Sequence, residues 1–386
     1  MNILFSPGQN AYRMRVRSWL EHNLPPQWDH LASLQQETSE NATFLIEWER
    51  KLYAAGYSGI TWPREFGGQG LSAIDNLIAN EEMGRRGAPD SVSLIGRDLV
   101  GPILLHAGTK EQKALYIPRI LAVDDIWCQG FSEPNAGSDL AAIKTGATRE
   151  GGQWKIRGQK TWTSYAHLAN KCIVLARTNL QARRHRNLTL FIVDMKSPGV
   201  EVRPIVHING KAHFNEVFFN DVLVDESMRI GEVGQGWQVA MGVLSFERAT
   251  TRLFRQQRYM FELRRLASFV AADPQLRNDS CTLQGLGELY SSFSLLRYQN
   301  FKFIGRIAKG APVGDEASIL KLFWSVTHQK FSSFAVDVLG TRLFDNDPLA
   351  KWFQDLYLVA RGETIYAGTS NIQKSIIAER MLGLPR

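Results

Sequence analysis

The chain has 386 residues, of which 22% are charged and 44% are hydrophobic, and this balance is typical of a globular protein with two or three domains. The net charge of +7 is modest and comes without a clustered basic motif, so we expect no nucleic-acid binding. The longest apolar runs are too short for a membrane span, and residues 1–10 lack the pattern of a signal peptide. The three cysteines are far apart in the sequence, which argues against a disulfide framework or a clustered metal site and for the cytoplasm.

The first third of the chain is predicted to be helical, over residues 11–122. Apolar residues recur at helical spacing from residue 44 onward, and Gly56 ends that run. Two further helices are expected over Ala73–Met83 and Lys110–Leu121.

The middle of the chain changes to short β-rich runs that are separated by turns. There are five such runs: Trp154–Ile156, Cys172–Ala176, Leu188–Val193, Val200–Val206 and Glu216–Phe219. Runs of this length and spacing predict a small antiparallel barrel or sandwich. Because the chain becomes helical again beyond them, we predict an α+β protein with three domains. These are an N-terminal helical domain over 1–123, a middle β-domain over 124–232 and a C-terminal four-helix bundle over 233–386.

The C-terminal segment joins a Gly-Thr-Ser turn to an amphipathic helix. Ser370 and Gln373 have the spacing of a capping box, so a helix is predicted to begin at Ser370. One face of this helix is apolar and consists of Ile372, Ile376 and Ile377. The turn before it leaves backbone N–H groups and the Thr369 hydroxyl free for a phosphate or a polarised oxygen. The alternative is a helix with a purely structural role.

Two other segments carry polar groups in distinctive turns and strands. Residues 129–141 read Gln-Gly-Phe-Ser-Glu-Pro-Asn-Ala-Gly-Ser-Asp-Leu-Ala, and residues 158–164 read Gly-Gln-Lys-Thr-Trp-Thr-Ser. Taken alone, the first could be an ordinary loop and Trp162 an ordinary core residue. Together with the C-terminal segment, however, they closely resemble the signatures of the acyl-CoA dehydrogenase family of flavoproteins. The chain also lacks the strand–Gly-x-Gly-x-x-Gly–helix unit of a Rossmann domain.

The resemblance implies a site for FAD. In it, Gln129, Phe131 and Ser132 lie along the flavin, and Trp162 covers one face of the ring system. The edge of the ring is bonded by Thr163 and Ser164, and the C-terminal turn adds Thr369 and Asn371. For the substrate, the resemblance implies contacts from Ser138, Arg186, Leu244, Ser245, Arg248, Ala367 and Gly368. Arg186 belongs to the run 183–186, which is either a solvated loop or a contact for the phosphates of coenzyme A.

The family's reaction needs a carboxylate that removes the α-proton of an acyl thioester while flavin N5 takes the β-hydride. Most members hold this glutamate just before the Gly-Thr of the C-terminal turn, where this chain has Ala367, which cannot take a proton. A smaller branch, which includes isovaleryl- and long-chain acyl-CoA dehydrogenases, holds it on the helix after the β-domain, where this chain has Glu247. We therefore expect Glu247 to be the base, with Arg248 bordering the site. The alternative is a surface charge paired with Arg248.

The chain departs from the family in the segments that reach the neighbouring subunit's flavin adenylate. There is no Arg-x-x-Phe-Gly run, and the Gln-x-x-Gly-Gly run is replaced by Asp337-Val-Leu-Gly340. One interpretation is a homotetramer that binds the adenylate differently, for example through Arg342. The other is an α2β2 heterotetramer with a paralogous chain, as in some bacterial enzymes that act on steroid side-chain thioesters.

The resemblance predicts dehydrogenation of an acyl-CoA to the trans-2-enoyl-CoA, with electrons passed to an electron-transfer flavoprotein. Two alternatives remain open. One is a flavin-dependent oxidase or monooxygenase on the same fold, and the other is a non-catalytic subunit of a hetero-oligomeric acyl-CoA dehydrogenase. The sequence does not identify the acyl group, nor whether coenzyme A or a carrier protein bears it.

Overall fold

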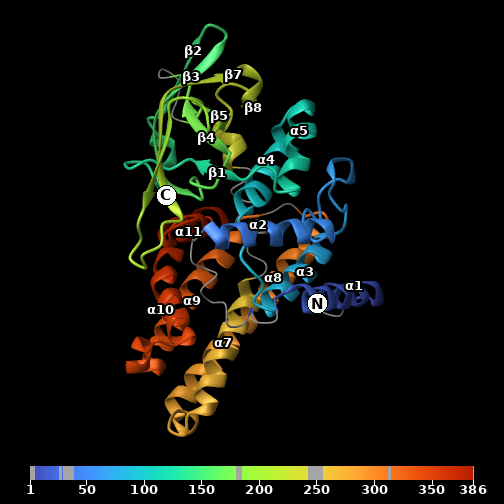
Figure 1. The fold of residues 1–386 in the computed structure, drawn as a ribbon, viewed down its shortest axis with the longest axis vertical. Helices are drawn as coiled ribbons and strands as arrows, with labels where there is room; N and C mark the ends of the chain where they lie inside the picture. Colours follow the sequence, from blue (N-terminus) through green and yellow to red (C-terminus); the bar gives the residue numbers. More distant parts are fainter. Residues whose placement is uncertain are drawn as a thin grey trace. The chain divides into compact units, whose positions relative to one another are not determined.

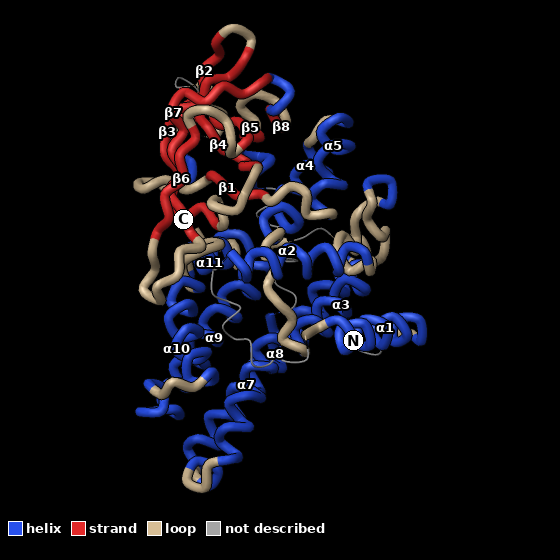
Figure 2. The backbone as a smooth tube through the Cα atoms, in the orientation of Figure 1, coloured by secondary structure: helices blue, strands red, loops and turns tan. Residues whose placement is uncertain are grey.

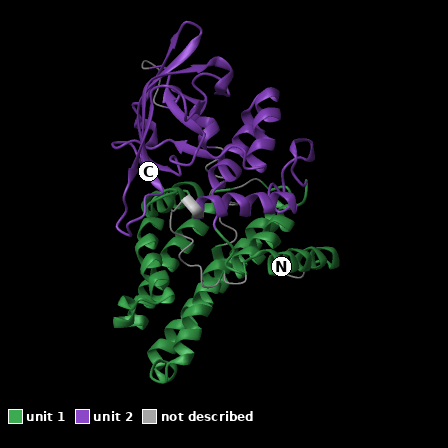
Figure 3. Cartoon of the chain, viewed as in Figure 1, with its two compact units in different colours: residues 1–36, 70–89, 248–386 green, residues 37–69, 90–247 purple. Residues whose placement is uncertain are grey.

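The computed structural model describes residues 5–25, 28, 39–179, 185–241, 255–311 and 314–385. The chain forms two compact units (Figure 3). Unit 1 consists of residues 1–36, 70–89 and 248–386, and unit 2 consists of residues 37–69 and 90–247. The N-terminal helices are therefore shared between the units, while all the strands belong to unit 2 (Figures 1 and 2).

Unit 1 is helical. Its helices are α1 (Pro7–Asn23), α3 (Ala73–Arg85), α7 (Arg255–Ala272), α8 (Ser280–Ile307), α9 (Ala317–Leu339), α10 (Pro348–Glu363) and α11 (Ser370–Ile376). Capping boxes begin α1 at Ser6 and α3 at Ser72, where the hydroxyl accepts a bond from the backbone N–H three residues on. The core packs aromatic rings between α7, α8, α9 and α10, and its fully buried members include Phe293, Phe331 and Phe353.

Unit 2 combines helices with a sheet. Its helices are α2 (Ser39–Ala54), α4 (Gly101–Ala107) and α5 (Lys110–Leu121), with a π-helical turn over Gly96–Val100. The Gln112 side chain, which also belongs to the capping box of α5, donates to the carbonyls of Ser227 and Arg229 at 2.7 and 2.9 Å. These two bonds attach α5 to the end of the sheet.

The sheet has eight strands. They are β1 (Trp127–Gly130), β2 (Gly146–Glu150), β3 (Gln153–Ser164), β4 (Lys171–Arg177), β5 (Leu188–Asp194), β6 (Val200–Ile205), β7 (Phe214–Asp225) and β8 (Arg229–Ile230). Their order is β6-β7-β3-β2-β4-β5-β8, and β1 pairs with β4 in parallel. Because β6 and β8 are not paired with each other in the described chain, the sheet is open, and of the two predicted alternatives, barrel or sandwich, the barrel is wrong.

The α+β class and the order helices, sheet, helices are confirmed. The helix predicted over Lys110–Leu121 has the bounds of α5, and the run that Gly56 ends is α2. The predicted boundaries at residues 123 and 232 stay predictions. Cys128 and Cys172 are far apart in sequence but face each other across β1 and β4, where both thiols are buried and free. No helix among the described residues has both the length and the apolarity that a bilayer crossing requires.

Candidate active site

The loop after β1 carries the first group of predicted cofactor residues and is held by a buried ion pair. Lys160 on β3 has no exposed surface, and its ammonium donates to the Phe131 carbonyl at 3.0 Å and to Glu133 Oε1 at 2.9 Å. Glu133 also accepts from the backbone N–H groups of Lys144 and Thr145, at 2.6 and 2.8 Å. This one pair therefore holds the loop of Phe131 and Ser132 against β3.

The same pair sets the protonation of both partners. Burial acts to raise the pKa of Glu133, but the Lys160 charge and the hydrogen bonds to the carboxylate outweigh it, and the pKa lies below its usual value. Burial lowers the pKa of Lys160 to about 8, against the opposing pull of Glu133. Both groups are therefore charged at neutral pH.

Trp162 is presented to the surface by an irregular stretch of β3. Its backbone has a φ of +58°, and the pairing of β3 with β7 shifts register between Lys160 and Thr163. Such a conformation costs a residue with a Cβ about 1–2 kcal/mol. The indole is 58% exposed and meets the Phe214 ring edge to face at 6.0 Å. The positive φ that exposes the Trp162 indole therefore costs conformational energy. Strained backbone that presents an exposed side chain is typical of a functional position.

The remaining predicted residues of this group differ in exposure. Gln129, Ser132 and Ser164 are half-buried, and the Ser132 carbonyl accepts from Thr161 N–H at 2.9 Å. Thr163 is buried, and its hydroxyl has no hydrogen-bond partner in the described chain. Ser138 and Arg186 are exposed.

In unit 1, the turn between α10 and α11 carries Ala367 and Gly368 at φ values of +53° and +87°. The Gln373 side chain donates to both of their carbonyls, at 3.0 and 3.4 Å. None of the hydrogen bonds within the described chain is donated by the N–H of Ala367 or of Gly368. The turn therefore offers donors of fixed direction, as the sequence predicted.

The cap of α11 differs from the prediction. Thr369, and not Ser370, is the N-cap, because its backbone is extended and its hydroxyl accepts from Ile372 N–H at 3.2 Å. The Ser370 N–H is bonded instead to the Thr364 carbonyl at 3.0 Å. The Thr369 hydroxyl is thus occupied with capping and does not point away from the helix. Ile372 and Asn371 are exposed.

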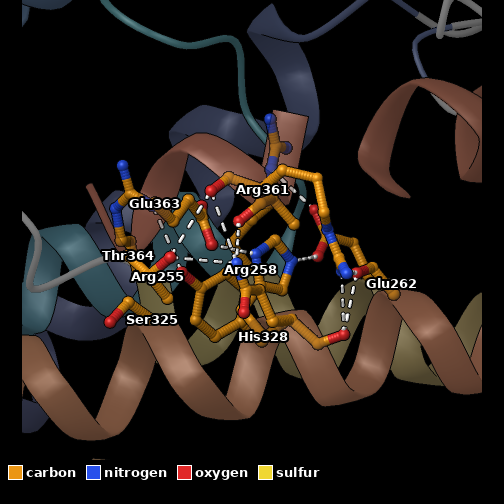
Figure 4. Close-up of polar contacts among 12 residues, drawn as sticks. Arg255, Arg258, Glu262, Ser325, His328, Arg361, Glu363 and Thr364 are labelled. Carbon is orange, nitrogen blue, oxygen red and sulfur yellow. Dashed lines mark hydrogen bonds and ion pairs between the residues drawn. The ribbon is translucent and has the colours of Figure 1, made fainter. Parts of the chain in front are cut away.

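Sequence reasoning missed a buried charge network beside this turn. Figure 4 shows Arg255, Glu262, His328 and Glu363 converging from α7, α9 and the end of α10. The available signal was a single histidine within an apolar helix, which does not identify its partners. Four predicted residues, Leu244, Ser245, Glu247 and Arg248, lie outside the described residues.

Comparison with known proteins places this chain in a class of oxidoreductases. Three models of the acyl-CoA dehydrogenase family match the chain in order: the N-terminal domain over residues 6–124, the middle domain over 128–222 and the C-terminal domain over 234–382. The chain therefore belongs to the acyl-CoA dehydrogenase family, whose members are flavoproteins.

Individual relatives agree along nearly the whole chain. Acyl-CoA dehydrogenase IpdE1 from Mycobacterium tuberculosis is 41% identical over 379 residues, which cover 97% of each chain. Among solved structures, the Tcur3481-Tcur3483 steroid ACAD is similar with a TM-score of 0.90 and 26% identity, covering 100% of both chains. The ChsE4-ChsE5 complex from Mycobacterium tuberculosis matches with a TM-score of 0.86 and 28% identity, again over 100% of both chains.

Proposed function

We propose that this protein catalyses the α,β-dehydrogenation of an acyl-CoA thioester to the trans-2-enoyl-CoA. FAD, when bound, accepts the β-hydrogen as a hydride at flavin N5 and is reoxidised by an electron-transfer flavoprotein. The observation that carries this proposal is Trp162, an exposed indole on strained backbone beside a loop that a buried ion pair holds in place. A rigid, exposed aromatic face suits a planar ring system.

We propose the contacts to FAD from where the side chains of unit 2 lie. Trp162 covers one face of the ring system, and Ser164 and Ser132 offer half-buried hydroxyls as hydrogen-bond partners. Gln129 and Phe131 support the flavin from the loop that Lys160 fixes. Thr163 is proposed to bond the edge of the ring system, because its buried hydroxyl has no hydrogen-bond partner in the described chain. Thr369 and Asn371 contribute from the C-terminal turn.

Polarisation of the thioester is assigned to the turn in unit 1. Negative charge builds on the thioester oxygen as the α-proton leaves, so a fixed donor at that oxygen accelerates the reaction. The N–H of Ala367, with Gly368 beside it, is such a donor, since nothing in the described chain accepts from it. A ribityl hydroxyl of FAD would supply the second donor when the cofactor is bound.

Glu247 is proposed as the base that removes the α-proton. Ala367 occupies the position of the base in most of the family and has no proton acceptor, so the carboxylate has to come from elsewhere. In a dry pocket the pKa of a carboxyl group rises, and the group becomes a better base. Arg248 is proposed to organise the site around it.

The acyl group is proposed to be bulky and ring-bearing. The support is similarity to a solved structure described as a steroid ACAD, at 26% identity. Leu244 and Ser245 line the acyl pocket in this proposal, Ser138 faces the pantetheine, and Arg186, which is exposed, meets the nucleotide phosphates of coenzyme A.

We further propose an α2β2 heterotetramer with a paralogous chain. Arg342, the alternative ligand for the adenylate, is already paired with Asp273 at 2.5 Å, and Asp337 is exposed where the family has a neutral amide. Two similar solved structures carry names that pair two different chains.

Anaerobic mixing of the purified holoprotein with a panel of acyl thioesters tests the function. Straight-chain, branched and ring-bearing thioesters of coenzyme A and of a carrier protein are compared by the loss of flavin absorbance. We expect bleaching by ring-bearing coenzyme A thioesters and slow reoxidation of the reduced flavin by oxygen. Fast reoxidation by oxygen would indicate an oxidase, and no bleaching by any thioester would indicate a non-catalytic subunit.

A further inference from the structure

His328 is buried on α9 between two carboxylates. Its Nδ1 lies 2.7 Å from Glu363 Oε2 and its Nε2 lies 3.2 Å from Glu262 Oε2, and the exposed fraction of the residue is 3%. A carboxylate oxygen can only accept from an imidazole nitrogen, so both nitrogens must carry protons. The ring is therefore an imidazolium that joins α7 to the end of α10 (Figure 4).

Two arginines extend this group of His328 and two glutamates into a row of charges of alternating sign. Arg255 Nη1 donates to Glu363 Oε1 at 2.8 Å, and Arg258 Nε lies 3.7 Å from Glu262 Oε1. In space, the charges thus follow the order Arg255, Glu363, His328, Glu262 and Arg258. The Tyr259 ring stacks on His328 at 3.9 Å, with the two planes inclined by 17°. Buried charges are tolerated when each has a partner, and here each carboxylate lies between two cations.

The network ends at the turn that carries Ala367. Glu363 is the last residue of α10, and its carbonyl accepts from Lys321 Nζ at 2.9 Å. Arg255 Nη2 also donates to the hydroxyl of Tyr366, the residue before Ala367, at 3.4 Å. The turn is therefore tied to α7 and α9 both at its start and next to Ala367.

Gln329 adds a neutral bond to the same turn. From α9, about two turns of helix away from Lys321 and next to His328, it donates to Thr364 Oγ1 and to the Ala360 carbonyl, each at 3.1 Å. The backbone that aims the Ala367 N–H is thus held by side chains of α7 and α9 as well as by its own helix.

We propose that Glu262, His328, Glu363 and Arg255 form a positioning network that holds the thioester-binding turn of residues 364–369 in its productive conformation. The proposal rests on the proposed function, since it assigns the Ala367 N–H to the substrate oxygen. None of the four residues is a catalytic residue in this proposal, because they act through the backbone of the turn. Arg255 also lies eight residues after Glu247 in the sequence.

A matched control exists in the same unit. Glu81 on α3 is equally buried, and it binds Arg13 at 2.9 Å and Arg297 at 2.6 Å. It links α1, α3 and α8 and makes no bond to the turn. Glu363→Gln and Glu81→Gln therefore each neutralise one buried carboxylate between two cations. They differ because Glu363 lies at the start of the turn, whereas Glu81 makes no bond to it.

The first measurement compares amide hydrogen exchange of the two variants, followed by mass spectrometry on peptides that cover residues 361–373. Because losing a charged hydrogen bond costs roughly 1.5–3 kcal/mol, Glu363→Gln should speed exchange in this segment by about tenfold or more. Glu81→Gln should leave this segment unchanged and speed exchange in α1. Equal exchange of the turn in both variants would overturn the proposal.

The second measurement is the limiting rate of flavin reduction by a bleaching thioester, with bound flavin quantified. Glu363→Gln and His328→Gln should lower the limiting rate more than the apparent substrate affinity, with unchanged flavin content, while Glu81→Gln should lower neither. The rate of the wild-type protein should fall as the pH rises through about 9, the pKa of His328, and that decrease should be missing in His328→Gln. Equal rates in Glu363→Gln and Glu81→Gln would contradict the proposal.

The two proposals fail in different ways. If no thioester bleaches the wild-type flavin, the proposed function fails, whereas the exchange comparison still decides whether the network holds the turn. Should Glu363→Gln not fold, His328→Gln carries the same comparison, because it also leaves the two glutamates without a cation between them.

Discussion

At the scale of single residues, the buried charge of Lys160 fixes the loop after β1, which the sequence shows only as a motif. Its ammonium is bonded to Glu133 and to the Phe131 carbonyl in a fully buried environment. Lys160→Met should therefore leave a buried carboxylate without its cation and lower the free energy of unfolding by about 3–5 kcal/mol. Urea unfolding measures this change, and the flavin content of the folded fraction should fall with it. A variant that unfolds like the wild type and keeps its flavin would show that the pair does not hold the loop.

His328 predicts a pH dependence of stability. Burial acts to lower its pKa, but the charge of Glu363 and the bonds to both glutamates outweigh burial and raise the pKa to about 9. A group whose pKa is raised on folding stabilises the protein fully below its unfolded pKa of about 6.5, and this contribution is lost as the pH rises through about 9. The contribution is on the order of 3 kcal/mol, at about 1.4 kcal/mol per pKa unit.

Unfolding at pH 6.5 and pH 9.5 checks this expectation. The free energy of unfolding of the wild type should fall between these values, and the fall should be much smaller in His328→Gln. The same decrease in both proteins would assign it to other groups and would contradict the raised pKa of His328.

At the scale of elements, the turn between α10 and α11 combines two residues of positive φ with backbone N–H groups that we propose bind the substrate. Ala367→Gly relieves the strain of a positive φ and keeps the N–H, so stability and flavin reduction should change little. Ala367→Pro cannot adopt this φ and has no N–H, so flavin reduction should fall by about a hundredfold or more, as for loss of an oxyanion donor. Single-turnover reduction of the two variants gives the comparison. Similar rates for both would remove Ala367 from the proposed site.

Helices were more predictable than strands because their periodicity extends over several turns. The bounds of α5 follow from its capping box and apolar spacing, whereas β1, β2 and β8 contain two to five residues and were missed. Whether a sheet closes depends on how its edge strands meet, which no local pattern encodes. At the cap of α11, two adjacent residues have hydroxyl groups; Thr369 is the N-cap, and the Ser370 N–H bonds to the Thr364 carbonyl within the preceding turn.

Some residues of the candidate site could be predicted from the sequence, and others could not. Trp162 and Ala367 could be found because motifs of contiguous residues mark them. The network around His328 could not, because Glu363 and Glu262 are 35 and 66 residues away from it in sequence. Only the packing of α7, α9 and α10 brings these charges together, and a single sequence does not reveal which charged residues share an interior.

At the scale of the whole molecule, the sequence carries the motifs predicted for one half of the cofactor site and lacks those predicted to reach a neighbour's flavin. Large apolar side chains remain exposed in unit 1, among them Phe344 at 83% and Leu382 at 67%.

Expression with and without a paralogous chain tests the assembly. The chain alone should carry much less than one flavin per protomer, and co-expression with the correct partner should give a stable α2β2 complex with flavin bound. Absorbance of the flavin against protein mass, combined with light scattering, measures both quantities. A homotetramer with one flavin per chain would rule out the need for a partner.

The central claim is that Glu247 removes the α-proton, and reduction of the bound flavin by an acyl thioester in Glu247→Gln tests it most directly. Because a positioned base contributes about a hundredfold or more to such a step, flavin bleaching should become at least that much slower while the flavin content stays equal to the wild type. Complete bleaching at the wild-type rate, in a variant with full flavin content, would contradict the assignment of Glu247 as the base.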